Sequence, residues 1–395
     1  MGKLVVLMVT ALVDMIGVVM IVPLLPFYAE RFGATGAEIG LMIGAFSVAQ
    51  LVSAPLWGRL SDRRGRRPTL LLGLSISAAA YVVFAFSTSY WLLLVSRLVQ
   101  GIGGGTVGVV QAYVTDIAKP QDRAKHLGWL SAATSAGAVV GPGAGSLLAQ
   151  VWGKSAPGLA AAALALVNIV FAWRYLRESY ATADGARPNA KAVRTRDALW
   201  QVLRRPTTPA ARLIWTYTVA IGAFYGMVAV FAQFLERRFN IDEHTIGYFF
   251  VWFGAMGVFT RVVLLGHALN WLGEMRLSRL GLALLGGGMV MFPFCHSYAT
   301  LWIAVTCMPL GTAFTFPGVT ATLSRVVPST DRGLYMSVQQ TFGGVARAVF
   351  PWWDGFAFDR YGMSAPFVLA GLMCLATIGT GLGLEGPREA EPATE

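Results

Sequence analysis

Residues 58–68 read GRLSDRRGRRP, a short polar loop that separates two long apolar runs. Five arginines and one carboxylate, Asp62, lie here between the run at 38–57 and the run at 69–88. Each run is close to the roughly 20 apolar residues that a helix needs to cross a bilayer. A basic loop between two such runs is typical of a membrane protein, because lysine and arginine concentrate on the cytoplasmic side of the spans.

The same alternation continues along all 395 residues. Apolar residues make up 55% of the chain and charged residues only 13%, against about 25% charged residues in a soluble domain. We therefore predict an all-α membrane protein. The predicted spans are 4–25, 38–57, 69–88, 91–114, 127–149, 157–176, 213–235, 245–265, 277–296, 299–321, 334–356 and 363–384.

One long polar segment, 177–212, divides these spans into two groups of six. We predict an N-terminal six-helix bundle at 1–176, a cytoplasmic linker in the polar segment, a C-terminal six-helix bundle at 213–385 and a cytoplasmic tail at 386–395. Within the linker, residues 197–203 fit either a short helix on the membrane surface or a plain connection.

The basic residues set the orientation and account for the net charge of +11. Of the 31 lysines and arginines, 23 lie in or beside segments that face the cytoplasm if the amino terminus is inside, and 5 lie in the opposite loops. Arg97, Arg261 and Arg347 lie within spans. We therefore predict an integral protein of the cytoplasmic membrane with both termini inside. The charge requires no nucleic-acid partner, and we expect the chain to act as a monomer in the lipid bilayer.

Two stretches of the sequence partly match nucleotide-binding motifs, but neither has the surrounding residues that such a site needs. Gly103, Gly105 and Gly108 have the spacing of a dinucleotide loop but lie in an apolar span without a preceding strand. Lys154 follows a glycine, as in a phosphate-binding loop, but Leu148 occupies the place of that loop's first glycine. The sequence also lacks paired histidine and cysteine clusters and a nucleophile turn. We predict no enzyme activity, no cofactor and no metal, so a gradient must supply any energy.

Four motifs give the chain a resemblance to the major facilitator superfamily, and within it to the twelve-helix drug–proton antiporters such as the tetracycline exporters. The loop at 58–68 is similar to the signature loop of the family, and SRLVQGIGGG at 96–105 is similar to its fourth-helix motif. GAVVGPGAG at 137–145 resembles the glycine–proline motif of the antiporters. LVDMIGVVMIVPLLP at 12–26 resembles the first helix of tetracycline exporters. The resemblance implies two six-helix bundles in a pseudo-two-fold relation and transport by alternating access.

The resemblance also implies roles for individual residues. A cytoplasmic gate is implied at Gly58, Asp62, Gly65, Arg66 and Asp116, and its charged members would hold the outward-facing state. The two glycines of the loop are expected to permit tight turns. An antiporter helix motif is implied at Gly137, Gly141, Pro142 and Gly145. Its glycines form a small-residue face that lets another helix approach closely.

The second half carries what looks like a degenerate repeat of the signature loop. Residues 266–276 read GHALNWLGEMR and keep two glycines, Gly266 and Gly273. Asn270 stands where the first copy has Asp62. We therefore expect a charge cluster at the cytoplasmic gate in the first half only.

Asp14 lies about ten residues into the first span, near the middle of the bilayer at about 1.5 Å per residue. A charged aspartate at that depth costs roughly 2.5–3.5 kcal/mol. Asp14 must therefore face the bundle interior, pair with a cation or be protonated, and Arg97 reaches a similar depth. Burial and a nearby cation favour opposite charge states, which predicts proton coupling by Asp14 and Arg97. The alternative is a static ion pair between them.

The other charges within spans leave more than one interpretation open. Arg261 lies near the inner end of its span and fits a structural role, because its long side chain reaches the interface. Arg347 fits either neutralisation of substrate charge or an ion pair with Asp354. Asp354 itself lies near the outer face, where water can hydrate it.

We predict a drug-sized apolar cavity with a few polar anchors. Its candidate residues are Gln50, Gln111, Gln233, Phe224, Tyr225, Trp252, Arg347 and Gln339.

The predicted function is proton-coupled export of hydrophobic or amphipathic small molecules, so the expected partners are a small-molecule substrate and protons. The alternatives are an importer or metabolite carrier of the same fold and a non-transporting membrane sensor. Tetracycline is not the expected substrate. Ala80 precedes Tyr81 where the tetracycline exporters carry an acid, and Gly257 stands where they carry a histidine.

Overall fold

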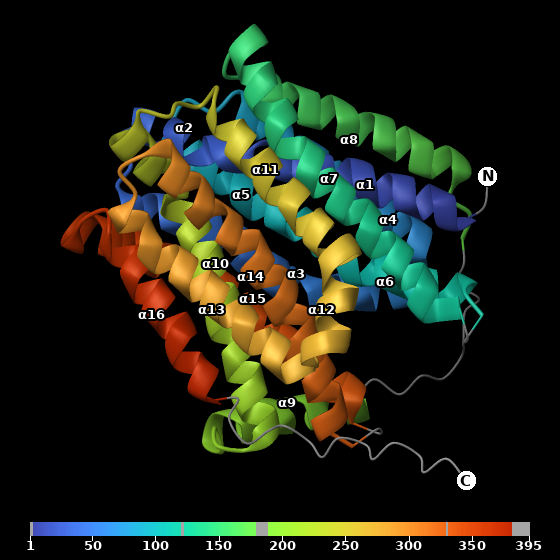
Figure 1. Cartoon of the computed structure of the whole chain (residues 1–395). Helices are drawn as coiled ribbons and strands as arrows, with labels where there is room; N and C mark the ends of the chain where they lie inside the picture. The colour runs from blue at the N-terminus through green and yellow to red at the C-terminus, as the bar shows by residue number, and fades with distance from the viewer. Residues whose placement is uncertain (1–2, 120–121, 179–188, 329–330, 381–395) are drawn as a thin grey trace. The chain divides into compact units, whose positions relative to one another are not determined.

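The computed structural model describes residues 3–119, 122–178, 189–328 and 331–380, and these residues form helices and short connections without a strand (Figure 1). The helices of the first half are α1 Lys3–Met20, α2 Leu25–Arg31, α3 Gly36–Arg64, α4 Arg66–Ala85, α5 Tyr90–Gly104, α6 Val107–Ile117, α7 Arg123–Trp152 and α8 Ala156–Tyr175. After them come α9 Asn189–Arg204, α10 Pro209–Phe239, α11 Ile246–Phe259, α12 Leu265–Leu272, α13 Glu274–Met291, α14 Tyr298–Val326, α15 Arg332–Tyr361 and α16 Ala365–Thr380.

Within the described residues, each of the twelve predicted spans overlaps one helix or successive helices. The end of the last span, 381–384, and the predicted tail at 386–395 lie outside the described residues. In the described part of the chain, nine helical segments are long and apolar enough to cross a membrane. The first span is interrupted by a 3-10 turn at Val22–Leu24, which contains Pro23. The eighth span contains a π-helical turn at Thr260–Leu264. The prediction of an all-α, multi-pass membrane protein is confirmed.

Local sequence explains where several of these helices begin and end. Thr35 caps α3, because its hydroxyl accepts the N–H of Glu38 while the Glu38 carboxylate accepts the N–H of Thr35. The hydroxyls of Ser89 and Ser297 cap α5 and α14 by accepting the N–H groups of Leu92 and Thr300. Gly65 has φ +97°, a backbone conformation that favours glycine. The chain therefore turns sharply at Gly65, between α3 and α4, as predicted.

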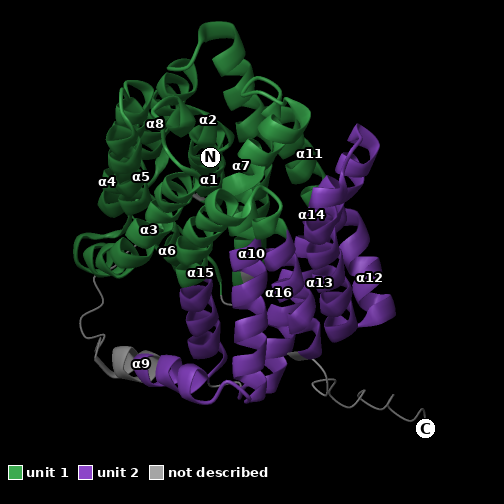
Figure 2. Ribbon diagram, turned by 90° about the vertical axis from the view of Figure 1, so that its left-hand side faces the viewer, with its two compact units in different colours: residues 1–187, 224–258, 344–367 green, residues 188–223, 259–343, 368–395 purple. Residues whose placement is uncertain are grey.

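Contacts divide the chain into two compact units, which Figure 2 distinguishes by colour. The first unit holds residues 1–187, 224–258 and 344–367, and the second holds 188–223, 259–343 and 368–395. A buried core of the first unit consists of Val6, Leu7, Trp57, Leu70, Val109, Tyr113, Val114, Leu130 and Leu176. In the second unit α13 packs closely on α14. A Cβ at Gly311 would lie 2.6 Å from the backbone N of Leu285. The division of the sequence into two six-helix halves stays a prediction.

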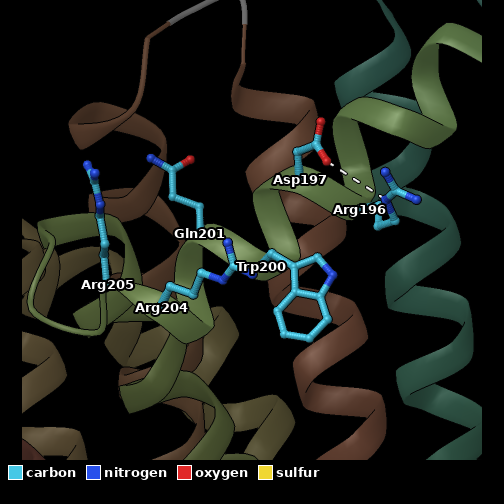
Figure 3. Close-up of a pocket in the computed structure, with 6 residues that line it drawn as sticks. All are labelled: Arg196, Asp197, Trp200, Gln201, Arg204 and Arg205. Atoms are coloured by element: carbon cyan, nitrogen blue, oxygen red, sulfur yellow. Dashed lines mark ion pairs between the residues drawn. The ribbon is translucent and has the colours of Figure 1, made fainter.

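The linker contains α9, a longer helix than the predicted 197–203. Ala198 and Val202, one turn apart, are buried, whereas Trp200 is exposed. The guanidinium of Arg204 lies 5.4 Å from the centroid of the Trp200 indole. A pocket of about 560 Å³ is lined by Arg196, Asp197, Trp200, Gln201, Arg204 and Arg205 (Figure 3). The helical interpretation of this segment is confirmed, and its place on the membrane surface stays a prediction.

Candidate functional site

Asp14 lies on α1 and is partly buried. One turn later, Gly17 lies against α4, where a Cβ would be 3.2 Å from the Tyr81 hydroxyl. Tyr81, which is fully buried on α4, therefore places its hydroxyl beside α1, about one turn from Asp14.

Arg97 on α5 is buried, at 3% exposure, and makes two contacts of its own. Its Nη1 donates a hydrogen bond to Oε1 of Gln100, one turn further along the helix. Its guanidinium carbon lies 4.6 Å from the centroid of the Phe46 ring, a cation–π distance. Among the described residues no ion pair joins Arg97 to Asp14. The alternative of a static ion pair between Arg97 and Asp14 is therefore wrong for this structure, because Gln100 and Phe46 engage the arginine. The prediction of proton coupling by these two residues stays a prediction.

The small-residue face of α7 packs directly on α1, the helix that carries Asp14. A Cβ at Gly137 would lie 2.6 Å from the Leu12 carbonyl oxygen. At Gly145 it would lie 2.0 Å from the Met20 carbonyl oxygen. Gly141 lies between them against Ile16 and Val19. These approaches are too close for a side chain, so the backbone contact between the two helices requires glycine.

Pro142 lies on another side of α7, which meets α11. A Cβ at Gly247 of α11 would lie 3.1 Å from the Pro142 carbonyl oxygen. A Cβ at Gly143 would lie 2.6 Å from a methyl group of Val251. The motif thus combines one face for α1 with a second close contact to α11.

Arg66 brings together the charged residues of the implied cytoplasmic gate. Its Nη1 donates to Oδ1 of Asp62 at 2.7 Å, and its Nε donates to Oδ2 of Asp116 at 2.9 Å. Nη1 also lies 2.9 Å from the Ser61 hydroxyl. Gly58 lies within α3, and a Cβ added there would have no described neighbour from another segment within 4 Å. The expected turn at Gly58 is therefore wrong, and the turn occurs at Gly65 alone.

Glu178 belongs to this cluster, although the sequence offered no motif for it. Its carboxylate accepts the backbone N–H of Arg66 at 2.9 Å and that of Arg67 at 3.1 Å. These N–H groups open α4, where an anion is favoured by the exposed donors of the helix. The only sequence signal is a lone acid directly after the sixth span.

The second half has an ion pair at the corresponding place, with the charges exchanged. Gly273 has φ +74° and separates α12 from α13, as Gly65 separates α3 from α4. The next residue, Glu274, pairs with Arg325 at the end of α14, at 2.8 Å between Oε1 and Nη2. The expectation of a charge cluster in the first half only is wrong. It relied on Asn270 and overlooked that Glu274 stands where the first copy has Arg66.

The predicted orientation places the C-terminal ends of α2 and α10 on the outer side of the membrane. Several polar side chains contact one another there. Arg31 pairs with Glu243 at 2.5 Å. The buried Gln233 donates from Nε2 to the Glu30 carboxylate at 2.6 Å, and Arg237 lies 3.3 Å from the same oxygen. These residues border a pocket of about 470 Å³ lined by Phe27, Glu30, Arg31, Glu236, Asp242, Glu243 and His244. Although partial burial acts in the opposite direction, hydrogen bonds from Thr245 hold the pKa of Asp242 below its usual value.

Hydrogen bonds join the start of α3 to α15. The Asp359 carboxylate accepts the N–H groups of Gly36 at 2.9 Å and Ala37 at 2.8 Å. One turn into α3, a Cβ at Gly40 would lie 1.9 Å from the Pro351 carbonyl oxygen. The two helices are thus in backbone contact along several turns.

The predicted cavity residues make several different kinds of contact in the described structure. Phe224 and Tyr225 stack edge to face, and the Arg347 guanidinium lies 5.8 Å from the Tyr225 ring centroid. Gln233 instead binds Glu30, as described above, and Gln339 is fully buried, accepting a hydrogen bond from Thr320.

The remaining candidates have other surroundings. Gln50 donates to the Gly104 carbonyl oxygen at 3.1 Å, close to the Phe46 ring. Gln111 is exposed and Trp252 is 41% exposed. Arg261, which is not a cavity candidate, lies exposed in the π-helical turn. The single cavity that these residues would line together stays a prediction.

Comparison with known proteins agrees with this architecture. A sequence model of the Major Facilitator Superfamily matches residues 7–351 and again 214–394. The tetracycline resistance protein of class C from Escherichia coli is 30% identical over 84% of this chain and 83% of its own length. Multidrug resistance protein 1 of Bacillus subtilis is 25% identical over 99% of this chain and 98% of its own length.

Solved structures show the same fold. The human organic anion transporter MFSD10 (TETRAN) superposes with a TM-score of 0.72 at 23% identity, covering 96% of this chain and 98% of its own. The nucleoside transporter NupG superposes with a TM-score of 0.82 at 11% identity, covering 98% of this chain and 100% of its own. The chain therefore belongs to the Major Facilitator Superfamily, as the resemblance of its motifs predicts.

Proposed function

We propose that the protein exports hydrophobic or amphipathic small molecules across the cytoplasmic membrane in exchange for protons, by alternating access. The observation that carries the proposal is Asp14, an ionisable group in the middle of an apolar helix with no ion-pair partner among the described residues. Such groups in transporters mark proton or substrate pathways. The relatives named as multidrug and tetracycline resistance proteins support a drug-like substrate.

The proposed cycle follows from what Asp14 can bind. A proton arriving from outside neutralises the carboxylate, and its release to the cytoplasm restores the charge. The Tyr81 hydroxyl provides a polar group beside α1, about one turn from Asp14. The net exchange is a proton moving inward for a substrate molecule moving outward, so the pH gradient drives export.

A transport assay tests the proposal. Purified protein in liposomes with an imposed pH gradient is expected to accumulate ethidium, tetraphenylphosphonium or another hydrophobic compound on the acidic side. Dissipating the gradient with a protonophore should stop the accumulation. Movement towards the alkaline side would instead indicate an importer. No gradient-dependent flux across a broad set of compounds would favour the sensor.

Orientation can be checked by labelling cysteines. Arg64→Cys in the 58–68 loop should react with an impermeant thiol reagent only from the cytoplasmic side, and Lys154→Cys only from outside. Both positions are exposed, and the expectation rests on the bias of basic residues towards inner loops. Two of the native cysteines, Cys295 and Cys374, are buried, and a background without native cysteines removes their signal. Labelling of the two positions from the opposite sides would invert the proposed topology.

Asp62→Asn should slow transport while leaving expression near normal. Asp62 and Asp116 both bind Arg66, and the Asp62 side chain is 61% exposed. Losing one charged hydrogen bond of this kind shifts a two-state equilibrium by about 1 kcal/mol, or roughly fivefold. Initial rates of ethidium efflux measure the effect, and Asp197→Asn on α9, which is 65% exposed, serves as control. Equal rates for Asp62→Asn and wild type would reduce the loop to a topology signal.

A further inference from the structure

Asp354 on α15 is a buried carboxylate without a partner among the described residues. The sequence predicts hydration or an ion pair with Arg347, and both expectations are wrong. The side chain is only 1% exposed, and its Oδ2 is buried. No side-chain hydrogen bond or ion pair joins it to any described residue. Arg347, two turns earlier on the same face of the helix, lies over the Tyr225 ring instead.

Gly226 on α10 closes the space around this carboxylate. A Cβ at Gly226 would lie 2.2 Å from Oδ2 of Asp354 and 3.2 Å from the Phe350 carbonyl oxygen. The α10 backbone therefore lies directly against the carboxyl group, and no organic molecule fits between them. A proton is the one ligand of the proposed cycle that this site can take.

In the described part of the chain, no charged or titratable group on the helices packed against Asp354 forms an ion pair or hydrogen bond with it. The groups considered are Arg347, Asp359 and Arg360 on α15, Tyr225, Glu236 and Arg237 on α10, and Glu38 on α3. The Asp359 carboxylate accepts hydrogen bonds from the start of α3, and the Glu38 carboxylate accepts one from the N–H of Thr35. Arg237 lies over the Phe358 ring and near Glu30. An ionised carboxylate in these surroundings is strongly disfavoured, whereas a protonated one is tolerated.

The contact between α3 and α15 controls access to this turn. Pro351 and Gly355, three residues before and one after Asp354, are among the α15 residues that meet α3. A Cβ at Gly355 would lie 2.0 Å from the Gly36 carbonyl oxygen, and Gly40 lies against Pro351. Asp354 lies about 10 Å from the outer end of α15. If these helices part during alternating access, water enters the outer part of α15. Water can then reach Asp354 and exchange its proton.

We propose that Asp354 is a second proton-binding site of the transport cycle, closed to outer water while α3 and α15 are in contact and loaded with a proton when they part. The inference rests on the proposed proton-coupled export. In that cycle Asp354 takes up one proton from outer water when the two helices part and gives it up towards the cytoplasm after they have come together again, so that one proton moves inward without any covalent change.

Infrared spectroscopy of the purified protein in lipid nanodiscs tests the protonation without a substrate. Asp354→Asn is expected to remove one component of the protonated-carboxyl band at neutral pH. Asp197→Asn, the same change at an exposed position, should leave that band unchanged. Hydrogen–deuterium exchange of the component should be slow in wild type and several-fold faster in Asp359→Asn, which weakens the α3–α15 contact without changing volume.

Proton counting then connects the site to transport. With ethidium as probe, Asp354→Asn should exchange fewer protons per ethidium than wild type while still transporting down a substrate gradient. A band that persists in Asp354→Asn, or an unchanged proton count, would overturn the inference and leave the proposed function intact. A wild type that transports ethidium but ignores the pH gradient would overturn the proposed function, and this inference with it.

Discussion

Asp14→Asn is expected to abolish uphill export driven by a pH gradient, while the protein still folds and still binds substrate. Asparagine keeps the size of aspartate and can form hydrogen bonds, but it cannot gain or lose a proton. Accumulation of ethidium in liposomes should therefore fall to the level of protein-free vesicles. Exchange of external for internal ethidium at equal pH moves no net proton, so it should persist.

The decisive measurement is proton release when substrate is added to the purified protein. Wild type should release protons and Asp14→Asn fewer or none. Arg97→Lys keeps the charge but loses the planar donor group that holds Gln100 and Phe46, so a milder defect is expected. Equal proton release from wild type and Asp14→Asn would make Asp14 a structural residue and would place coupling elsewhere.

Gly145→Ala should destabilise the protein more than any other single methyl group added to α7. The new Cβ would lie 2.0 Å from the backbone carbonyl oxygen of Met20, and a backbone atom cannot move aside as a flexible side chain can. Overpacking of this kind costs typically 1–3 kcal/mol. The melting temperature in detergent should fall, and transport should fall with it because α1 carries Asp14.

Gly128→Ala on the same helix is the matched control. Among the described residues, no neighbouring atom lies within 4 Å of a Cβ there, so the substitution removes a flexible glycine from a helix at no steric cost. It should be neutral or stabilise the protein by about 0.5–1 kcal/mol. If both variants melt at the same temperature, the contact between α1 and α7 is not what makes glycine necessary at position 145.

The spans could be predicted from the sequence because a helix that crosses a bilayer needs a long apolar run, and such runs are visible directly in the sequence. It also predicted the grouping of Asp62, Arg66 and Asp116, though only through a motif shared with a family. Contacts that depend on which way a side chain turns were missed. Gln100 lies one turn after Arg97, so its spacing was the available signal, but whether Arg97 turns to Gln100 or to Asp14 depends on side-chain packing, in which the Phe46 ring takes part.

Burial was harder to predict than position. Asp354 lies near the end of a helix, where hydration is the ordinary expectation, but the backbone of α10 at Gly226 lies directly against its carboxylate. The pair of Glu274 and Arg325 joins residues that are 51 positions apart in sequence. Aligning the two loops on their glycines would have placed an acid opposite Arg66, and that signal was available.

The exchange of charges between the two loops bears on how the chain assembles as it enters the membrane. Arg66 pairs with Asp116 in one half, and Glu274 pairs with Arg325 in the other. A nascent helix from one half that docked in the other's place would bring Arg66 to Arg325, or Glu274 to Asp116. Like charges then repel, so each loop rejects the wrong partner as well as attracting the right one. During insertion, these opposite charge patterns favour pairing of each loop with the helix of its own half.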